Sequence, residues 1–100
     1  MIFLTQLVYI HPGKETVFQE FEATAIPLIA KHNGELMLRI RPSGENIVAA
    51  HVEVPYETHV VRFQTDADFA AFAGDPERQR FLHLKNESVR TALLIKGAAV

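Results

Sequence analysis

Residues 2–10 read IFLTQLVYI, a segment rich in β-branched and aromatic side chains. Leu4 and Val8 fall on one face of an extended chain and Phe3 and Leu7 on the other, so both faces are apolar. This pattern is typical of a central strand that is covered on both sides. The fold must therefore place one layer on each face of this strand.

A helix is predicted after this strand, because residues 14–32 place apolar side chains at helical spacing. Pro27 lies inside the segment and predicts a kink or a break near Ile26. Asn33-Gly34 is predicted to adopt the left-handed backbone conformation that ends the helix. The polar residues expected to face water are Glu15, Gln19, Glu22 and Lys31.

Two further strands are predicted, at 35–41 and 56–64. The first alternates, with Leu36, Leu38 and Ile40 expected on one face and Met37, Arg39 and Arg41 on the other. The second is apolar on both faces, like 2–10. The connection between them is long, and its apolar residues 47–54 are read as a short extra strand.

The remaining chain predicts a second helix in two pieces and a last strand at 91–96. Thr65-Asp66-Ala67-Asp68 has the form of a capping box, and Asp75-Pro76-Glu77 restarts the helix with a cap and a first-turn proline. The order β-α-β-β-α-β predicts an α+β, ferredoxin-like domain over residues 1–100. It has a four-stranded antiparallel sheet with both helices on one face.

The other face of the sheet also carries apolar side chains, and a monomer seldom leaves so large an apolar face open. We therefore predict a homodimer that packs sheet against sheet. The chain has 100 residues, 48% of them hydrophobic, which fits one folded domain.

Composition excludes several classes of function. A net charge of -2 argues against nucleic-acid binding, so the basic residues Arg78, Arg80, His83, Lys85 and Arg90 are interpreted as a solvated helix surface. No apolar run is long enough to cross a membrane, and the first residues lack the pattern of a secretory signal, so we predict a cytoplasmic protein. The chain has no cysteine and its five glycines are isolated, so we predict no cofactor.

The sequence resembles the dimeric α+β barrel superfamily over nearly its whole length. The resemblance rests on His59-Val60-Val61-Arg62-Phe63, on Thr65-Asp66-Ala67-Asp68-Phe69 and on Asp75-Pro76-Glu77. These segments are similar to uncharacterised families of that superfamily and, more distantly, to antibiotic-biosynthesis-type monooxygenases. The resemblance implies two sheets that close into one barrel. It also implies an activity of the cofactor-independent monooxygenase or isomerase type on a small aromatic or enolisable compound.

Six polar residues are candidates for such a site. His59 lies in an otherwise apolar strand and is predicted to accept a proton, while Arg39 is predicted to stabilise an oxyanion. The other candidates for ligand binding are Tyr9, Arg41, Tyr56 and Arg62. The alternative for His59 is a hydrogen-bonded histidine of the core or of an interface. The alternative for the arginines is an edge strand kept in solution by charge or an intersubunit ion pair, and for the tyrosines a place in the core.

A metal site has one weak signal, because His51, Glu53, Glu57 and His59 share the parity of one extended strand. Pro55 argues against an unbroken strand, so we predict no metal. Two functions remain. A small-molecule enzyme predicts a closed cavity, whereas a non-catalytic homodimeric binding or interaction module predicts a filled interior.

Overall fold

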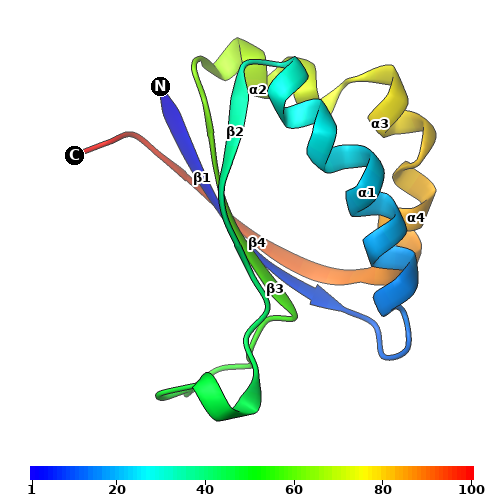
Figure 1. Ribbon diagram of the computed structural model, residues 1–100, viewed down its shortest axis with the longest axis vertical. Helices are drawn as coiled ribbons and strands as arrows, with labels where there is room; N and C mark the ends of the chain where they lie inside the picture. The colour runs from blue at the N-terminus through cyan, green and yellow to red at the C-terminus, as the bar shows by residue number, and fades with distance from the viewer.

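The computed structural model describes residues 1–100, and Figure 1 shows one layer of helices packed on one face of a sheet. The sheet has the strand order β2-β3-β1-β4, and all neighbouring strands are antiparallel. The predicted ferredoxin-like fold is therefore confirmed, with the first and third strands at the centre. The elements are β1 (Ile2–Ile10), α1 (Glu15–Lys31), β2 (Gly34–Ile40), η1 (Gly44–Asn46), β3 (Glu57–Phe63), α2 (Asp66–Ala73), α3 (Pro76–Arg80), α4 (Leu82–Ser88) and β4 (Val89–Gly97).

The core lies between the helices and the central strands. Leu4 of β1 pairs with Val61 of β3 and packs with Phe63 and with Ile29 of α1. The Phe69 and Phe72 rings of α2 lie 5.6 and 5.4 Å from the ring of Phe63. These aromatic contacts anchor the sheet to α1 and α2, because large rings bury much apolar surface and favour tilted contacts.

A bulge in β2 overturns the predicted alternation of that strand. Leu36 pairs with Val61 of β3, but Leu38 pairs with the adjacent residue Val60, so the register shifts between the two leucines. The residues after the shift change faces, as a one-residue slip requires. Leu38 and Ile40 therefore lie on the face without helices, and Arg39 lies on the helix side with Leu36.

Helix α1 runs unbroken from Glu15 to Lys31, so of the kink or break expected near Ile26, the break does not occur. Pro27 is exposed and removes one backbone donor from the helix. The expectation that Glu22 faces water is wrong, because Glu22 is buried on the same stripe as Phe18 and Ala25.

The second helical region consists of three short helices, α2, α3 and α4, where the sequence predicted two pieces. Both predicted caps are present: the Thr65 hydroxyl accepts from the Asp68 amide, and Asp75 accepts from the Glu77 amide. The additional break falls at Phe81, which has a non-helical φ of -106°. Helix α4 then leads directly into β4, so this strand begins before the predicted residue 91.

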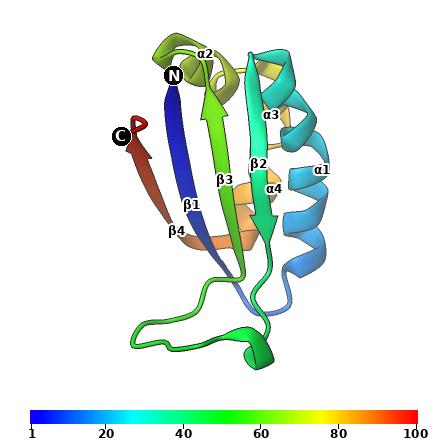
Figure 2. The same cartoon turned by 60° about the vertical axis from the view of Figure 1, so that its left-hand side comes forward.

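The long connection between β2 and β3 extends beyond the end of the sheet, as Figure 2 shows. The extra strand predicted within 47–54 is wrong, since these residues form no strand and the only regular element of the connection, η1, precedes them. Val48 and Val52 are exposed, and no neighbouring strand supplies the backbone partners that a strand needs. None of the helices is long and apolar enough to span a membrane.

Gly34 provides a test of the packing between β2 and the core. A Cβ atom at Gly34 would lie 2.6 Å from a ring carbon of Phe63 and 2.7 Å from a methyl of Ile29. We expect Gly34→Ala to lower the free energy of unfolding by about 1–3 kcal/mol, since the added methyl would overlap two buried side chains and force them to shift. Urea unfolding measures it, with Gly44→Ala as the control because nothing lies within 4 Å of its Cβ. Equal effects of the two substitutions would contradict the close approach.

Candidate functional site

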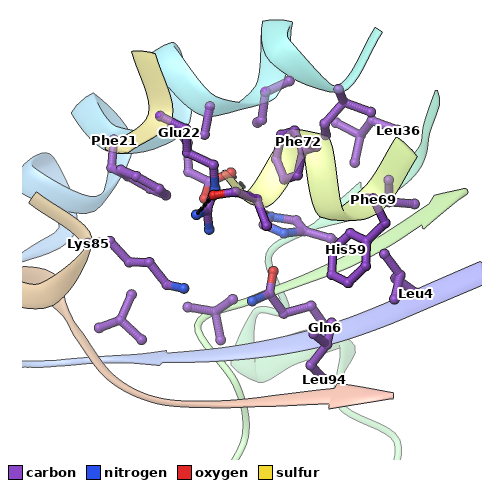
Figure 3. A pocket seen from close by; sticks show the side chains of 18 of the residues that line it. Leu4, Gln6, Phe21, Glu22, Leu36, His59, Phe69, Phe72, Lys85 and Leu94 are labelled. Atoms are coloured by element: carbon purple, nitrogen blue, oxygen red, sulfur yellow. Dashed lines mark hydrogen bonds and ion pairs between the residues drawn. The ribbon is translucent and has the colours of Figure 1, made fainter. Parts of the chain in front are cut away.

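A cavity of about 150 Å³ lies between the sheet and the helices. Most of its wall is apolar and comes from the core-facing residues of β1, β3, α1 and α2. Figure 3 shows polar side chains from four elements around this space, among them Gln6, Glu22, His59 and Lys85. Arg78 of α3 also lines it. An apolar cavity with a few convergent polar groups is the usual form of a small-molecule site.

The sheet forms the floor of the cavity, and a row of paired residues on neighbouring strands crosses it there. His59 of β3 pairs with Gln6 of β1 on one side and with Arg39 of β2 on the other. Gln6 in turn pairs with Leu94 of β4. Leu94 both lines the cavity and is 49% exposed, so the cavity reaches the surface beside β4.

Glu57 is the most enclosed charged residue of the chain, with 0% of its surface exposed. Its carboxylate accepts a hydrogen bond from Arg39 Nε at 3.1 Å, one from Arg41 Nε at 2.8 Å and a short one from His59 Nε2. Burial raises the pKa of Glu57, but the hydrogen bonds from His59, Arg39 and Arg41 outweigh it and lower the pKa to about 2. Glu57 is therefore a fixed anion that orients His59.

Glu22 of α1 approaches the same histidine from the helix side. Its Oε2 lies 3.8 Å from His59 Nε2. Burial raises the pKa of Glu22, and the neighbouring Glu57 raises it further, while His59 and Arg39 oppose the shift. A buried carboxyl group of raised pKa beside an imidazole is a candidate for holding or releasing a proton.

Two cations complete the wall, Arg78 and Lys85. The Arg78 guanidinium lies 5.6 Å from the Phe21 ring and 5.3 Å from the Phe72 ring, and it donates to the Ala73 carbonyl oxygen at 3.2 Å. Burial lowers the pKa of Lys85, and the charge of Arg78 lowers it further. The interpretation of Arg78 and Lys85 as solvated surface residues is therefore wrong.

Of the six predicted site residues, only His59 lines the cavity. Arg39 and Arg41 bind Glu57 directly behind it, so they support His59. Tyr56 accepts a hydrogen bond from Gln19 at 3.0 Å and packs edge-on against Phe18.

The other two predicted residues face away from the cavity. Arg62 pairs with Phe3 of β1 on the open face of the sheet and forms an ion pair with Glu35. Tyr9 pairs with Thr91 on that same face, and its hydroxyl donates to the Glu53 carbonyl oxygen at 3.1 Å.

The four residues of the suggested metal grouping do not meet. Glu53 binds Arg90, and His51 is exposed in the connection before β3. The residues that do converge are Glu22, Glu57 and His59, whose ligand atoms lie within 4.8 Å of one another. Both oxygens of Glu57 already accept hydrogen bonds from arginine, and His59 Nε2 already contacts Glu57, so a cation would compete with all these contacts. The arrangement therefore favours a buried ion cluster over a metal centre.

Sequence reasoning missed Gln6, Glu22, Arg78 and Lys85. A signal existed for Glu22, because it continues the spacing of Phe18, Ala25 and Ile29 on α1. Arg78 and Lys85 gave no such signal, since the break at Phe81 sets the direction of each short helix.

No protein-family model and no curated protein matches this sequence. Solved structures with similar folds exist. A protein of unknown function from Rhodopseudomonas palustris has a TM-score of 0.82 at 14% identity, covering 99% of this chain and 82% of that one. A dimeric ferredoxin-like protein from a Jannaschia species has a TM-score of 0.72 at 17% identity, covering 98% of both chains.

A NIPSNAP family protein of unknown function from Agrobacterium tumefaciens has a TM-score of 0.70 at 16% identity. The match covers 97% of this chain and 86% of that chain. At such low identities the likeness concerns the fold. It agrees with the ferredoxin-like class that the resemblance implied.

The Glu57 cluster predicts a specific acid sensitivity. The pKa of Glu57 in the folded chain, about 2, lies below its ordinary value of 4.5. The group therefore stabilises the fold fully above its ordinary pKa, and this contribution is lost as the pH falls through the folded value. We expect Glu57→Gln to lower the free energy of unfolding by about 3–5 kcal/mol at neutral pH and to flatten this acid dependence.

Urea unfolding across acid pH tests this expectation, with Glu35→Gln as the control because Glu35 is exposed. Part of the acid dependence will remain in Glu57→Gln, since hydrogen bonds from Lys31 and His32 hold the pKa of Asp75 well below its usual range. An unchanged pH dependence in Glu57→Gln would show that Glu57 is not the stabilising anion.

Proposed function

We propose that this protein binds a small aromatic or enolisable compound in the cavity and that His59 accepts a proton from it. The observation that carries the proposal is the position of the Glu22–His59–Glu57 cluster at the wall of an apolar cavity of about 150 Å³. A cavity of about this volume holds a benzene-sized ring. A homodimeric module without a ligand would need a filled interior, so the cavity favours binding over that alternative.

The contacts suggest a different chemical role for each of the three residues. With Nε2 of His59 donating to Glu57, the other ring nitrogen, Nδ1, is the acceptor in the neutral imidazole. Proton abstraction from a carbon beside a carbonyl would form an imidazolium, which the Glu57 anion stabilises. If the enolate is conjugated with a second C=C bond, protonated Glu22 can deliver its proton to the far carbon, and the proton taken by His59 then passes to Glu22. This sequence completes an isomerisation and restores both side chains. A monooxygenase would share the first step and use dioxygen as co-substrate.

Hydrogen exchange tests the proton transfer without knowledge of the natural substrate. We expect the protein to accelerate exchange of the benzylic protons of phenylacetone in D₂O, as followed by proton NMR. His59→Gln should slow this exchange by about 100-fold or more, since it removes the base but keeps a hydrogen-bond donor for Glu57. His83→Gln is the matched control, because His83 is exposed on α4. Binding of phenylacetone in the cavity with no exchange above the uncatalysed rate would leave a binding protein without this chemistry.

We further propose that the open face of the sheet packs against a second copy of the chain. The strand registers place apolar residues of all four strands on this face, and Leu38, Ile40, Leu93 and Ile95 are 46–52% exposed. Helices cover only the opposite face, as Figure 2 shows. Two proteins of similar fold, from a Jannaschia species and from Bacteroides fragilis, are described as dimeric, which supports a dimer without specifying its interface.

Substitution on the open face tests the dimer. Leu93 of β4 lies beside Leu7 of β1 on this face. We expect Leu93→Asp to convert a dimer into a monomer in sedimentation equilibrium, because a buried unpaired carboxylate at an interface is strongly unfavourable. Ala23→Asp, on the exposed side of α1, should leave the dimer unchanged. A wild-type monomer at high concentration would remove the proposal.

A further inference from the structure

The cationic part of the cavity wall lacks anionic partners. Arg78 Nε is buried and has no hydrogen-bond partner. Lys85 takes part in none of the ion pairs of the chain. Buried donors without partners are rare in folded proteins, because each one loses its hydrogen bonds to water. Here both cationic side chains line one cavity, and Figure 3 shows Lys85 pointing into it.

The carboxylates of the cluster do not supply the missing charge. Glu57 is held between Arg39 and Arg41, on the far side of His59. Glu22 is the one carboxylate whose charge acts on both Arg78 and Lys85, and no ion pair joins it to either. Arg78 and Lys85 thus have only the carboxylate of Glu22 to balance two positive charges, although the chain as a whole has a net charge of -2. The positive excess is local to the cavity.

The position of Arg78 also suits the recognition of an anion. Its guanidinium is fixed by the rings of Phe21 and Phe72 and by the Ala73 carbonyl oxygen. A guanidinium held in this way keeps its remaining N–H groups in a planar fork that matches a carboxylate. The adjoining wall is aromatic and aliphatic, so the rest of the ligand must be apolar.

We propose that the cavity takes a small carboxylic acid as its anion, with the carboxylate bound by Arg78 and Lys85 and the apolar body against Phe21 and Phe72. This inference rests on the proposed function and names the substrate class of the same site. The ligand's carboxylate would lie at the helix side of the cavity. Its carbon atoms would then lie at the sheet side, beside His59. A carbonyl acid with an acidic C–H bond fits both requirements.

Benzoate and benzamide have nearly the same shape but differ in charge, so comparing them tests whether the cavity prefers a carboxylate. We expect the full-length protein to bind benzoate about tenfold or more tightly than benzamide in isothermal titration calorimetry, because charged hydrogen bonds in a buried site are stronger than neutral ones. Arg78→Met and Lys85→Met should each remove most of this preference, because they weaken benzoate binding much more than benzamide binding. Methionine keeps the apolar packing of either stem.

Arg80→Met is the matched control, since Arg80 lies on the same helix with 73% of its side chain exposed. It should leave the benzoate preference intact. Equal affinities for benzoate and benzamide would overturn the carboxylate inference and leave the cavity proposal standing. A benzoate preference that survives both Arg78→Met and Lys85→Met would also overturn it. Failure of benzoate, benzamide and phenylacetone alike would overturn the proposed function itself.

Discussion

The buried carboxylate of Glu57 determines which side chains must lie around it on the helix side of the sheet. An anion with no exposed surface must be matched by donors, and here these come from Arg39, Arg41 and His59. The arginines reach the helix side only because β2 bulges between Leu36 and Leu38. Without the bulge, both arginines would lie on the open face and Glu57 would keep only His59 as a partner. The bulge and the anion therefore require each other.

Such a cluster is a poor way to gain stability. Burying charges costs solvation energy, and apolar residues of similar volume often stabilise a core as well or better. The chain already has an apolar core in Leu4, Ile29 and Phe63, with Phe69 and Phe72 packed against it. Glu57 and His59 are placed further along β3, beside the cavity. Their position agrees with the proton transfer proposed for the cavity wall.

The sequence predicted what depends on local periodicity and caps. The two-faced segments 2–10 and 56–64 indicated the central strands, and Thr65 and Asp75 marked two helix starts. It could not predict what depends on tertiary pairing. No glycine or proline marks the bulge at Met37, so strict alternation assigned Leu36 to the wrong face relative to Leu38.

The site shows the same division between local and tertiary information. His59 was identifiable because it directly precedes the apolar residues Val60 and Val61 in a predicted central strand. Its partner Glu22 comes from α1, and the other charged residues of the cavity wall, Arg78 and Lys85, come from α3 and α4. Their approach depends on how each helix packs. Glu22 was hidden by the rule that glutamates on helices face water, although its spacing matched the buried stripe.

The two proposed roles of the sheet are connected through the alternation of its strands. His59 and Gln6 face the cavity, while their chain neighbours Val60 and Leu7 face the open side. A second copy bound to the open face would therefore pack against the same strands that position His59 and Gln6 at the cavity. Close-packed layers transmit such constraints because they hold few voids. The dimer would then fix the geometry of the site while contributing no side chain to it.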